Sequence, residues 1–444
     1  MKQNNKTSQI KISIVGCTGF RNRGVDALVT CTIDGLREHF PGCKISLLTW
    51  TPEYDSQSAS TKDVNVIHYP YYSRKLQPEE SSESRKKRLG KNLRRILSNL
   101  LVNKHASDLT AVKPQVCNHL KDLIQDCDLL VITGGDVYST EYGAEGLGYY
   151  ISLIDTASHC NVPVALLGHS IGRFRGQEAQ DAWVQAASAI SFLTTRDQVS
   201  YDYLSSIKGL PANTFVTSDV AFILDKALST PSVCPKDVPL VALSISAGIA
   251  KWADITIYDY YQAWFAIVNY ILDNWNCNVL LIPHVHESYG DDRISQTKLF
   301  RDLGFDARVR VVAEDLTAAE YKAIISKADF LIAERMHAAI AGISSKVPSV
   351  VVSYSLKAHG LVQHAYSQVT LKENPPIYDA SDYQNYAKVL HAINEAWVAR
   401  YKLKADLEAS VPLLVASAKN NFVELAKWYH EYSICEHSLG NVPM

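Results

Sequence analysis

One stretch decides the fold of this chain: Ile332-Ala333-Glu334-Arg335-Met336-His337-Ala338-Ala339-Ile340-Ala341-Gly342. The apolar run Asp329-Phe330-Leu331-Ile332 leads into it, and a second apolar run, Pro348-Ser349-Val350-Val351-Val352-Ser353, follows it. An apolar run, a helix of small residues and another apolar run are the pattern of a parallel α/β sheet. Arg335 and His337 therefore lie where a strand ends and a helix begins, which is where open α/β sheets bind ligands.

These two side chains suit an anionic ligand. The N-terminus of a helix favours negative charge, a guanidinium matches the shape of a carboxylate or phosphate, and an imidazole transfers protons near neutral pH. The structural alternative is that Arg335 forms a salt bridge and His337 caps the helix. We expect an anion-handling active site with Arg335 and His337 as its catalytic residues.

The composition is that of a globular protein with more than one domain. The chain has 444 residues, of which 47% are hydrophobic and 20% charged, and this length predicts two or three domains. A net charge of −2 predicts no bulk attraction to nucleic acid. Nine cysteines without a C-x-x-C pair argue against a zinc ribbon or a disulfide framework.

We expect a cytoplasmic protein. Residues 1–9 are polar and lack the apolar core of a signal peptide. No apolar run approaches the roughly 20 residues that span a bilayer. The scattered cysteines also fit a reducing compartment.

Short apolar runs alternate with helical patterns along both halves of the chain, which predicts parallel α/β architecture. In the first half we expect strands at Ile10–Val15, Lys44–Trp50, Val64–Tyr69, Leu129–Thr133, Val162–Leu167, Ser191–Thr195 and Thr214–Thr217. In the second half we expect them at Leu240–Ser246, Val279–Pro283, Val309–Ala313, Phe330–Ala333 and Ser349–Ser353. Helices are expected at Asp26–His39, Gln177–Ala189, Tyr258–Trp275 and Ala318–Lys327.

The segment 229–239 divides the two halves, because it places three prolines among small polar residues and so has the composition of a linker. We expect one Rossmann-like domain over residues 1–230, a second over 231–380, and a helical tail over 381–444. The simplest arrangement has the two parallel sheets facing a central cleft. A basic insertion, 71–115, interrupts the first domain.

Within that insertion, residues 84–104 combine arginines and lysines with leucines at helical spacing. A basic amphipathic helix can lie on an anionic membrane surface, here the inner face of the membrane. It can equally dock its apolar stripe on its own domain. Both interpretations stay open.

The first strand is followed by Gly16-Cys17-Thr18-Gly19-Phe20-Arg21-Asn22-Arg23-Gly24-Val25-Asp26. Glycines after a strand allow the backbone to approach a ligand closely, but this is neither G-x-G-x-x-G nor a P-loop. Asn22 and Asp26 either cap the helix that follows or hold a sugar hydroxyl.

Three further strand ends carry polar side chains. Gly134-Gly135-Asp136 is expected to open the floor of the cleft, with Asp136 as a partner for an acceptor hydroxyl. The turn from Gly168 to Arg173 is of the same kind. Arg196 follows another strand on the cleft side, although its neighbour Asp197 offers a purely structural partner.

Ile282-Pro283-His284-Val285-His286 ends a strand of the second half. Two histidines two residues apart do not complete a metal site, so we expect no metal and a His284 that faces the cleft. Lys357 follows the strand after the opening stretch and brings a second cation near Arg335.

Together these motifs resemble the polysaccharide pyruvyl transferase family, from about Ile12 to about Leu361. The most specific part is the lead-in at 318–329 followed by Arg335-Met336-His337, with Tyr354…Lys357 closing the block. Weaker motifs match in the same order: Asn22-x-Gly24, Gly134-Gly135, Gly168…Gly172, Arg196-Asp197…Ser200 and Asp219-Val220-Ala221-Phe222.

The resemblance implies two Rossmann-like domains arranged much as in a GT-B glycosyltransferase, phosphoenolpyruvate as the donor, and a pyruvate ketal on a sugar as the product. His337 would be the general acid that protonates the donor's methylene carbon, and no metal or redox cofactor is needed. The expected donor-binding residues are Arg335, Lys357, Arg196 and His284. The acceptor, a saccharide that is free or lipid-linked, would contact Asn22, Asp26, Gly134, Gly135, Asp136 and Arg173.

Departures from the family pattern concern the acceptor. Val25 stands where the family usually has Asp, Ser or Thr, and His169 and Arg173 stand where it has Gln and Pro. Arg173 either recognises an anionic acceptor or pairs with an acid. An alternative is a GT-B glycosyltransferase with a nucleotide-sugar donor, for which only Glu314 and Glu334 are candidate acidic clamps. A third is a non-catalytic binding protein.

Overall fold

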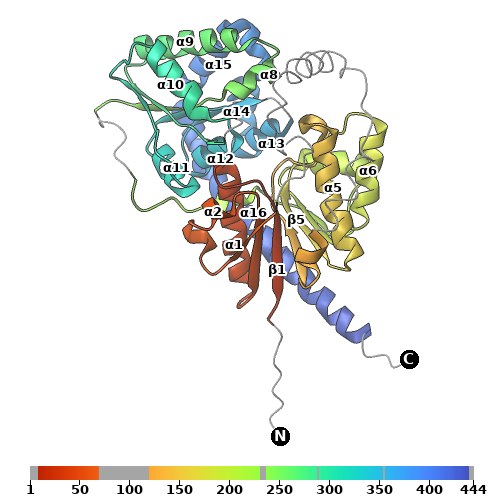
Figure 1. Cartoon of the computed structure of the whole chain (residues 1–444). Helices are drawn as coiled ribbons and strands as arrows, with labels where there is room; N and C mark the ends of the chain where they lie inside the picture. The colour runs from red at the N-terminus through yellow and green to blue at the C-terminus, as the bar shows by residue number, and fades with distance from the viewer. Residues whose placement is uncertain (1–8, 70–119, 231–236, 288–289, 354–355, 440–444) are drawn as a thin grey trace, which may run out of the picture.

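The computed structural model describes residues 9–69, 120–230, 237–287, 290–353 and 356–439. They form two α/β domains, each built on one parallel sheet, and a long C-terminal helix that touches both (Figure 1). The predicted fold class is confirmed. The basic segment 84–104 lies outside the described residues.

The N-terminal domain contains seven strands in the order β3-β2-β1-β4-β5-β6-β7, and every neighbouring pair is parallel. The strands are β1 (Lys11–Cys17), β2 (Lys44–Thr49), β3 (Asn65–His68), β4 (Leu129–Ile132), β5 (Val164–His169), β6 (Phe192–Thr195) and β7 (Thr214–Val216). The helices are α1 (Arg23–His39), α2 (Pro52–Asp55), α5 (Ala144–His159), α6 (Gln177–Ala187) and α7 (Gln198–Ser206), with short 3-10 turns η1 (Ala59–Thr61), η4 (Thr140–Tyr142) and η5 (Val220–Ile223).

The C-terminal domain contains six parallel strands in the order β10-β9-β8-β11-β12-β13. They are β8 (Leu240–Ser244), β9 (Asn278–Leu281), β10 (Val309–Val311), β11 (Phe330–Ala333), β12 (Ser349–Ser353) and β13 (Ile377–Asp379). The helices are α8 (Ala250–Ala253), α9 (Ile257–Asn274), α10 (Asp292–Asp302), α11 (Ala318–Ile325), α12 (Met336–Ser344), α13 (Leu356–Ala365), α14 (Gln368–Glu373), α15 (Tyr386–Val398) and α16 (Arg400–Leu439), with 3-10 turns η6 (Ala247–Ile249) and η7 (Ala380–Asn385).

The central strands are apolar along their whole length because both faces of each sheet are covered. All four residues of β4, β6 and β11 are buried, as is usual for parallel sheets packed between helices. All twelve predicted strands are present, with ends shifted by a few residues. β13 is an additional strand, and its three residues after two prolines are too short for a periodic pattern.

Helix α16 links the two domains. It begins beside α15 in the C-terminal domain and then packs on α1 and η5 of the N-terminal domain (Figure 1). Asn421 is fully buried there, and its side chain bonds Thr217 Oγ1 (2.9 Å) and the Ser218 carbonyl (2.9 Å). Phe422 packs against Gly35, where a Cβ would lie 2.5 Å from the phenyl ring. The tail therefore holds the edge of the N-terminal sheet.

Candidate active site

The turn between β11 and α12 places Arg335 at the interface of the two domains. Arg335 is the N-cap residue of α12, and its guanidinium donates to Asp292 from Nε (3.1 Å) and Nη2 (2.7 Å). Asp292 also accepts from the backbone N–H groups of His284 (3.1 Å) and Val285 (3.0 Å). The salt bridge that the structural alternative gave to Arg335 thus exists, yet 30% of the Arg335 side chain remains exposed. It is a cation fixed in direction at a helix N-terminus.

His337 lies in the first turn of α12 and is directed at the N-terminal domain. It does not cap the helix, because Arg335 holds that position without a side-chain cap bond. Its Nε2 is 3.9 Å from the carboxylate of Asp219. Burial lowers the pKa of His337, the carboxylate of Asp219 opposes that change, and the charge of Arg196 adds to it. An anionic ligand beside the ring would favour its protonated form.

Arg196 is held in a buried chain of polar side chains at the end of β6. It forms an ion pair with Asp219, and its Nε donates to Ser170 Oγ (2.7 Å), which in turn donates to Asp197 (2.6 Å). The negative charge of Asp136 raises the pKa values of both Arg196 and His337. The structure thus brings together Arg196, His337 and Asp136 from three strand ends.

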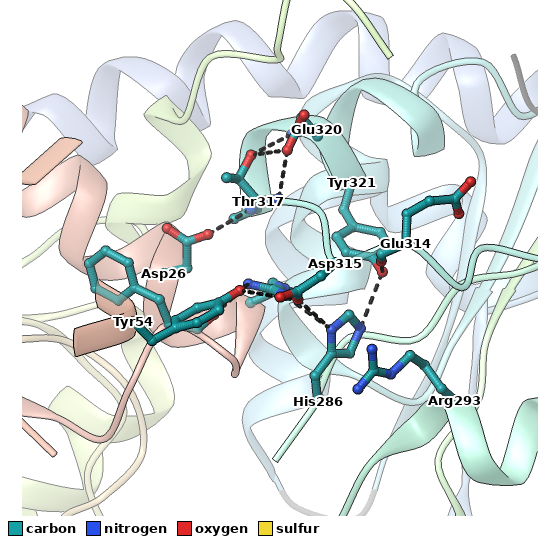
Figure 2. A network of polar contacts seen from close by, with 12 residues as sticks. Asp26, Tyr54, His286, Arg293, Glu314, Asp315, Thr317, Glu320 and Tyr321 are labelled. Carbon is teal, nitrogen blue, oxygen red and sulfur yellow. Dashed lines mark hydrogen bonds and ion pairs between the residues drawn. The ribbon is translucent and has the colours of Figure 1, made fainter. Parts of the chain in front are cut away.

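Two predicted acceptor residues have structural contacts. Asn22 caps α1 by accepting from the N–H of Gly24 (3.1 Å). Asp26 lies inside α1, and its carboxylate accepts from the N–H of Ala318 (2.7 Å) at the start of α11 in the other domain (Figure 2). Burial raises the pKa of Asp26 to about 6. Contact of either residue with a sugar stays a prediction.

The paired glycines allow β4 and β5 to approach closely. A Cβ on Gly134 would lie 2.6 Å from the carbonyl oxygen of Leu167, and Gly135 has φ +131° and bridges to His169. Arg173, at the end of the next turn, is exposed. The side chain of Lys357, in the first turn of α13, lies outside the described residues.

His284 and His286 face the interface from the end of β9. His284 is buried, and its carbonyl accepts from the N–H of Arg23 (3.0 Å). Burial lowers the pKa of His284 well below its usual value, and the neighbouring positive charges lower it further. Among the described residues, no three His, Cys, Asp or Glu side chains gather in a way that could hold a metal ion.

The sequence did not identify the network around Arg23, which joins the two domains. Arg23 is only 1% exposed and donates to Tyr54 (3.1 Å), to the His286 ring (3.0 Å) and to Asp315. Tyr54 also donates to Asp315 (3.0 Å). Figure 2 shows Tyr54 reaching Asp315 across the interface, and Asp315 in turn contacting His286. The sequence feature that could have drawn attention to Arg23 is its position inside the Asn22-x-Gly24 turn motif.

Glu334 forms a buried polar cluster directly before Arg335. Its carboxylate accepts from the N–H of Ser246 (2.5 Å) and the hydroxyl of Tyr260 (2.6 Å) on one oxygen. The other oxygen accepts from the Trp264 indole (3.0 Å) and the Tyr383 hydroxyl (2.5 Å). Burial raises the pKa of Glu334 to about 7 although all four donors lower it.

No helix in the described ranges is both long enough and apolar enough to cross a bilayer.

Two Rossmann-like domains with polar side chains gathered between them define a GT-B-like protein. The fold is similar to a putative UDP-N-acetylglucosamine 2-epimerase from Listeria monocytogenes (TM-score 0.59, 10% identity, covering 96% of this chain and 98% of that one). It is also similar to S. aureus MnaA solved with UDP (TM-score 0.55, 12% identity, covering 95% of this chain and 97% of that one). At such low identity these likenesses concern the fold alone.

The family is settled by the sequence match. The family model for polysaccharide pyruvyl transferase matches residues 22–355, so this chain belongs to that family. It is also 21% identical over 370 residues to the amylovoran biosynthesis protein AmsJ of Erwinia amylovora, covering 80% of this chain and 86% of AmsJ. The protein is therefore a transferase of polysaccharide biosynthesis, and the resemblance seen in its motifs is confirmed.

Proposed function

We propose that this protein transfers the pyruvyl group of phosphoenolpyruvate to a sugar of a cell-surface polysaccharide or its precursor and closes a pyruvate ketal there. One observation carries the proposal. His337, two residues after Arg335 at the N-terminus of α12, lies against Asp219 and within the field of Arg196 from the other domain. Membership of the pyruvyl transferase family supports the same reaction.

The donor's charges match these side chains. Phosphoenolpyruvate carries a phosphate and a carboxylate, which guanidinium groups bind well. Arg335 is directed by Asp292 and remains partly exposed, so it is suited to bind one of these groups. The N-terminus of α12 adds a favourable electrostatic contribution at the same place.

His337 is suited to protonate the methylene carbon of the donor. The double bond becomes a methyl group, and the hydroxyl of the sugar attacks the cationic carbon that results. Phosphate then leaves, and a second hydroxyl attacks to close the ketal. One hydroxyl proton replaces the proton that His337 gave, and the other leaves with the phosphate. The products are the ketal and inorganic phosphate, and neither metal nor redox chemistry is required.

The acceptor would lie against the N-terminal domain. Asn22 and Asp136 border the interface from that side, and Arg173 is exposed on the same domain. Contact of all three with the saccharide is part of the proposal. Arg173 would favour an acceptor that itself bears negative charge.

A nucleotide-sugar donor is less well supported. A ribose clamp would need a carboxylate free to accept from sugar hydroxyls. Glu334 already accepts from four internal donors and is buried, so it is not available. Of the two candidate clamps this leaves only Glu314, which is exposed on the surface.

Calorimetric titration tests the donor directly. Phosphoenolpyruvate and UDP-N-acetylglucosamine are titrated into the wild-type protein, Arg335→Ala, Arg335→Gln and Arg293→Ala. Arg293 is the matched control because it also pairs with an aspartate, Asp291, at similar exposure. We expect saturable phosphoenolpyruvate binding that both Arg335 variants lose and Arg293→Ala keeps. Binding of the nucleotide sugar without phosphoenolpyruvate would overturn the proposal.

A further inference from the structure

The turn at residues 21–24, which leads into α1, pairs with the main chain of the other domain. The N–H of Arg23 donates to the carbonyl of His284 (3.0 Å), and the N–H of His286 donates to the carbonyl of Arg21 (2.9 Å). These two bonds form a short antiparallel bridge between the domains, with the hydrogen-bond pattern of a strand pair. The turn is therefore held by the C-terminal domain as well as by its own.

The side chain of Arg23 reinforces this contact. It donates to the carbonyl of Phe20 (2.8 Å) within its own domain and forms an ion pair with Asp315 of the C-terminal domain. Asp315 lies between β10 and α11, and its carboxylate also accepts from the hydroxyl of Tyr54 (3.0 Å) and contacts His286 (3.0 Å) (Figure 2). One carboxylate thus ties two side chains of the N-terminal domain to the C-terminal domain.

Asp315 is charged in this contact. Burial raises the pKa of Asp315, but the hydrogen bond with His286 and the positive charge of Arg23 outweigh it, and the pKa lies below its ordinary value. The pair is uneven, because the Arg23 side chain is buried whereas 48% of the Asp315 side chain is exposed. Loss of the carboxylate would leave a buried guanidinium unpaired, which strongly disfavours the docked arrangement of the turn.

The proposed general acid depends on the same turn. Gly24 directly follows Arg23, and a Cβ at Gly24 would overlap the imidazole of His337. On its other side the ring has Nε2 at 3.9 Å from the carboxylate of Asp219. The backbone of His337 belongs to α12 of the C-terminal domain, whereas both neighbours of its ring belong to the N-terminal domain. The position of the imidazole therefore follows from how the two domains dock.

We infer that Asp315 is a positioning residue for His337. By pairing with Arg23 it holds the turn at residues 21–24 against the C-terminal domain, and Gly24 of that turn fixes one side of the imidazole. Asp315 acts through Arg23 and touches neither substrate. This inference rests on the proposed function, because it takes His337 as the acid of the pyruvyl transfer.

The test follows the imidazole directly by nuclear magnetic resonance of protein with isotope-labelled histidine. The ring resonances of His337 are those that His337→Ala lacks. Asp315→Ala removes the carboxylate, and Asp315→Asn keeps an oxygen that can accept from Tyr54. Asp306→Ala is the control, because Asp306 also pairs with an arginine in the same domain. Each variant is checked by thermal melting and titrated with phosphoenolpyruvate in a calorimeter.

Turnover is measured in a double-mutant cycle of Asp315→Ala and His337→Ala. Phosphate release from phosphoenolpyruvate is followed, and the acceptor is the cell-surface polysaccharide of the source cells after mild acid has removed its ketals. We expect Asp315→Ala to move the His337 resonances and to lower kcat about tenfold or more, while phosphoenolpyruvate binds with little change. In the His337→Ala background the same substitution should have no further effect on kcat. Asp315→Asn should be intermediate, and Asp306→Ala should match the wild type.

Unmoved His337 resonances in a folded Asp315 variant would overturn the inference and leave the proposed function standing. An equal loss of kcat with and without the imidazole would also overturn it, since Asp315 would then act on the fold as a whole. If Asp315→Ala does not melt cooperatively, Asp315→Asn takes its place in every comparison. Absence of phosphoenolpyruvate binding to the wild type would instead overturn the proposed function, and the positioning role with it.

Discussion

Gly24 and His337 lie so close together that a side chain on the first would displace the second. A Cβ at position 24 would be 2.3 Å from Nδ1 and 2.9 Å from Cγ of the imidazole. Gly24 is in the first turn of α1 and His337 is in the first turn of α12. The missing side chain therefore makes room for the proposed general acid at the contact between the two domains.

Gly24→Ala should reduce turnover while the protein remains folded. Alanine is favoured over glycine in a helix by up to about 1 kcal/mol, but the imidazole must move away from its position. We expect kcat to fall about 10- to 100-fold, since small misplacement of a catalytic group has effects of this size. Phosphate release from phosphoenolpyruvate and acceptor measures it. Gly290→Ala, where a Cβ would meet open space, is the control, and equal activity of the two variants would contradict the argument.

His337→Ala should separate binding from chemistry. The substitution removes the proposed acid but leaves the Arg335–Asp292 ion pair intact. We expect phosphoenolpyruvate to bind with little change and kcat to fall about 10²- to 10⁴-fold. Calorimetry and single-turnover kinetics on one preparation give both quantities. A variant with near wild-type turnover would exclude His337 as the acid.

Asp219→Asn should move the pH profile of the reaction. The carboxylate of Asp219 raises the pKa of His337, so its loss lowers that pKa further. The acid form is then lost earlier as pH rises, and the alkaline limb of kcat/KM should shift to lower pH by about one unit. The amide keeps the oxygen that caps η5 at Ala221. The exposed Asp202→Asn is the control, and an unchanged profile would argue against coupling of Asp219 to His337.

The strands and the position of the site could be predicted from the sequence because both depend on local patterns. Short, mostly apolar segments predict β1 and β11, and the change from strand to helix after β11 predicts where Arg335 and His337 lie. Strand β13 was not predicted because three residues are too few to show a hydrophobic periodicity.

The contacts across the domain interface could not be predicted in this way. Arg23 meets Asp315, 292 residues further on, and Asp26 accepts from Ala318 at the same separation. The sequence pattern predicted that Asp26 caps its own helix, whereas the N–H group from which it accepts belongs to Ala318 of α11. Such pairings depend on how the two domains dock, which no local spacing encodes.

Asp26→Asn should make stability less dependent on pH. The pKa of Asp26 is about 6 in the folded protein against an ordinary value of 3.8, so the folded state disfavours the ionised form. The favourable contribution is full below pH 3.8 and is lost as pH rises through about 6. Relative to wild type, the variant should therefore gain about 1 to 2 kcal/mol in free energy of unfolding between pH 5 and pH 8. Urea denaturation at both pH values measures it, with exposed Asp63→Asn as the control. A constant difference would show that Asp26 keeps its charge.

Glu334→Gln should destabilise the protein although it changes a single atom. Each carboxylate oxygen accepts from one N–H that cannot reverse its role, the backbone of Ser246 on one and the indole of Trp264 on the other. An amide nitrogen in either place therefore faces a donor inside the core. We expect a loss of about 2–4 kcal/mol in free energy of unfolding at pH 8, measured by urea denaturation.

The same substitution should also weaken phosphoenolpyruvate binding, because Glu334 fixes the turn that directs Arg335. The control is Glu314→Gln, which changes the same group on the exposed surface and should alter neither quantity. An unchanged unfolding midpoint for Glu334→Gln would mean that the tyrosine hydroxyls of Tyr260 and Tyr383 rearrange to satisfy the amide. Loss of stability with unchanged binding would instead show that Asp292 alone is enough to hold Arg335 in place.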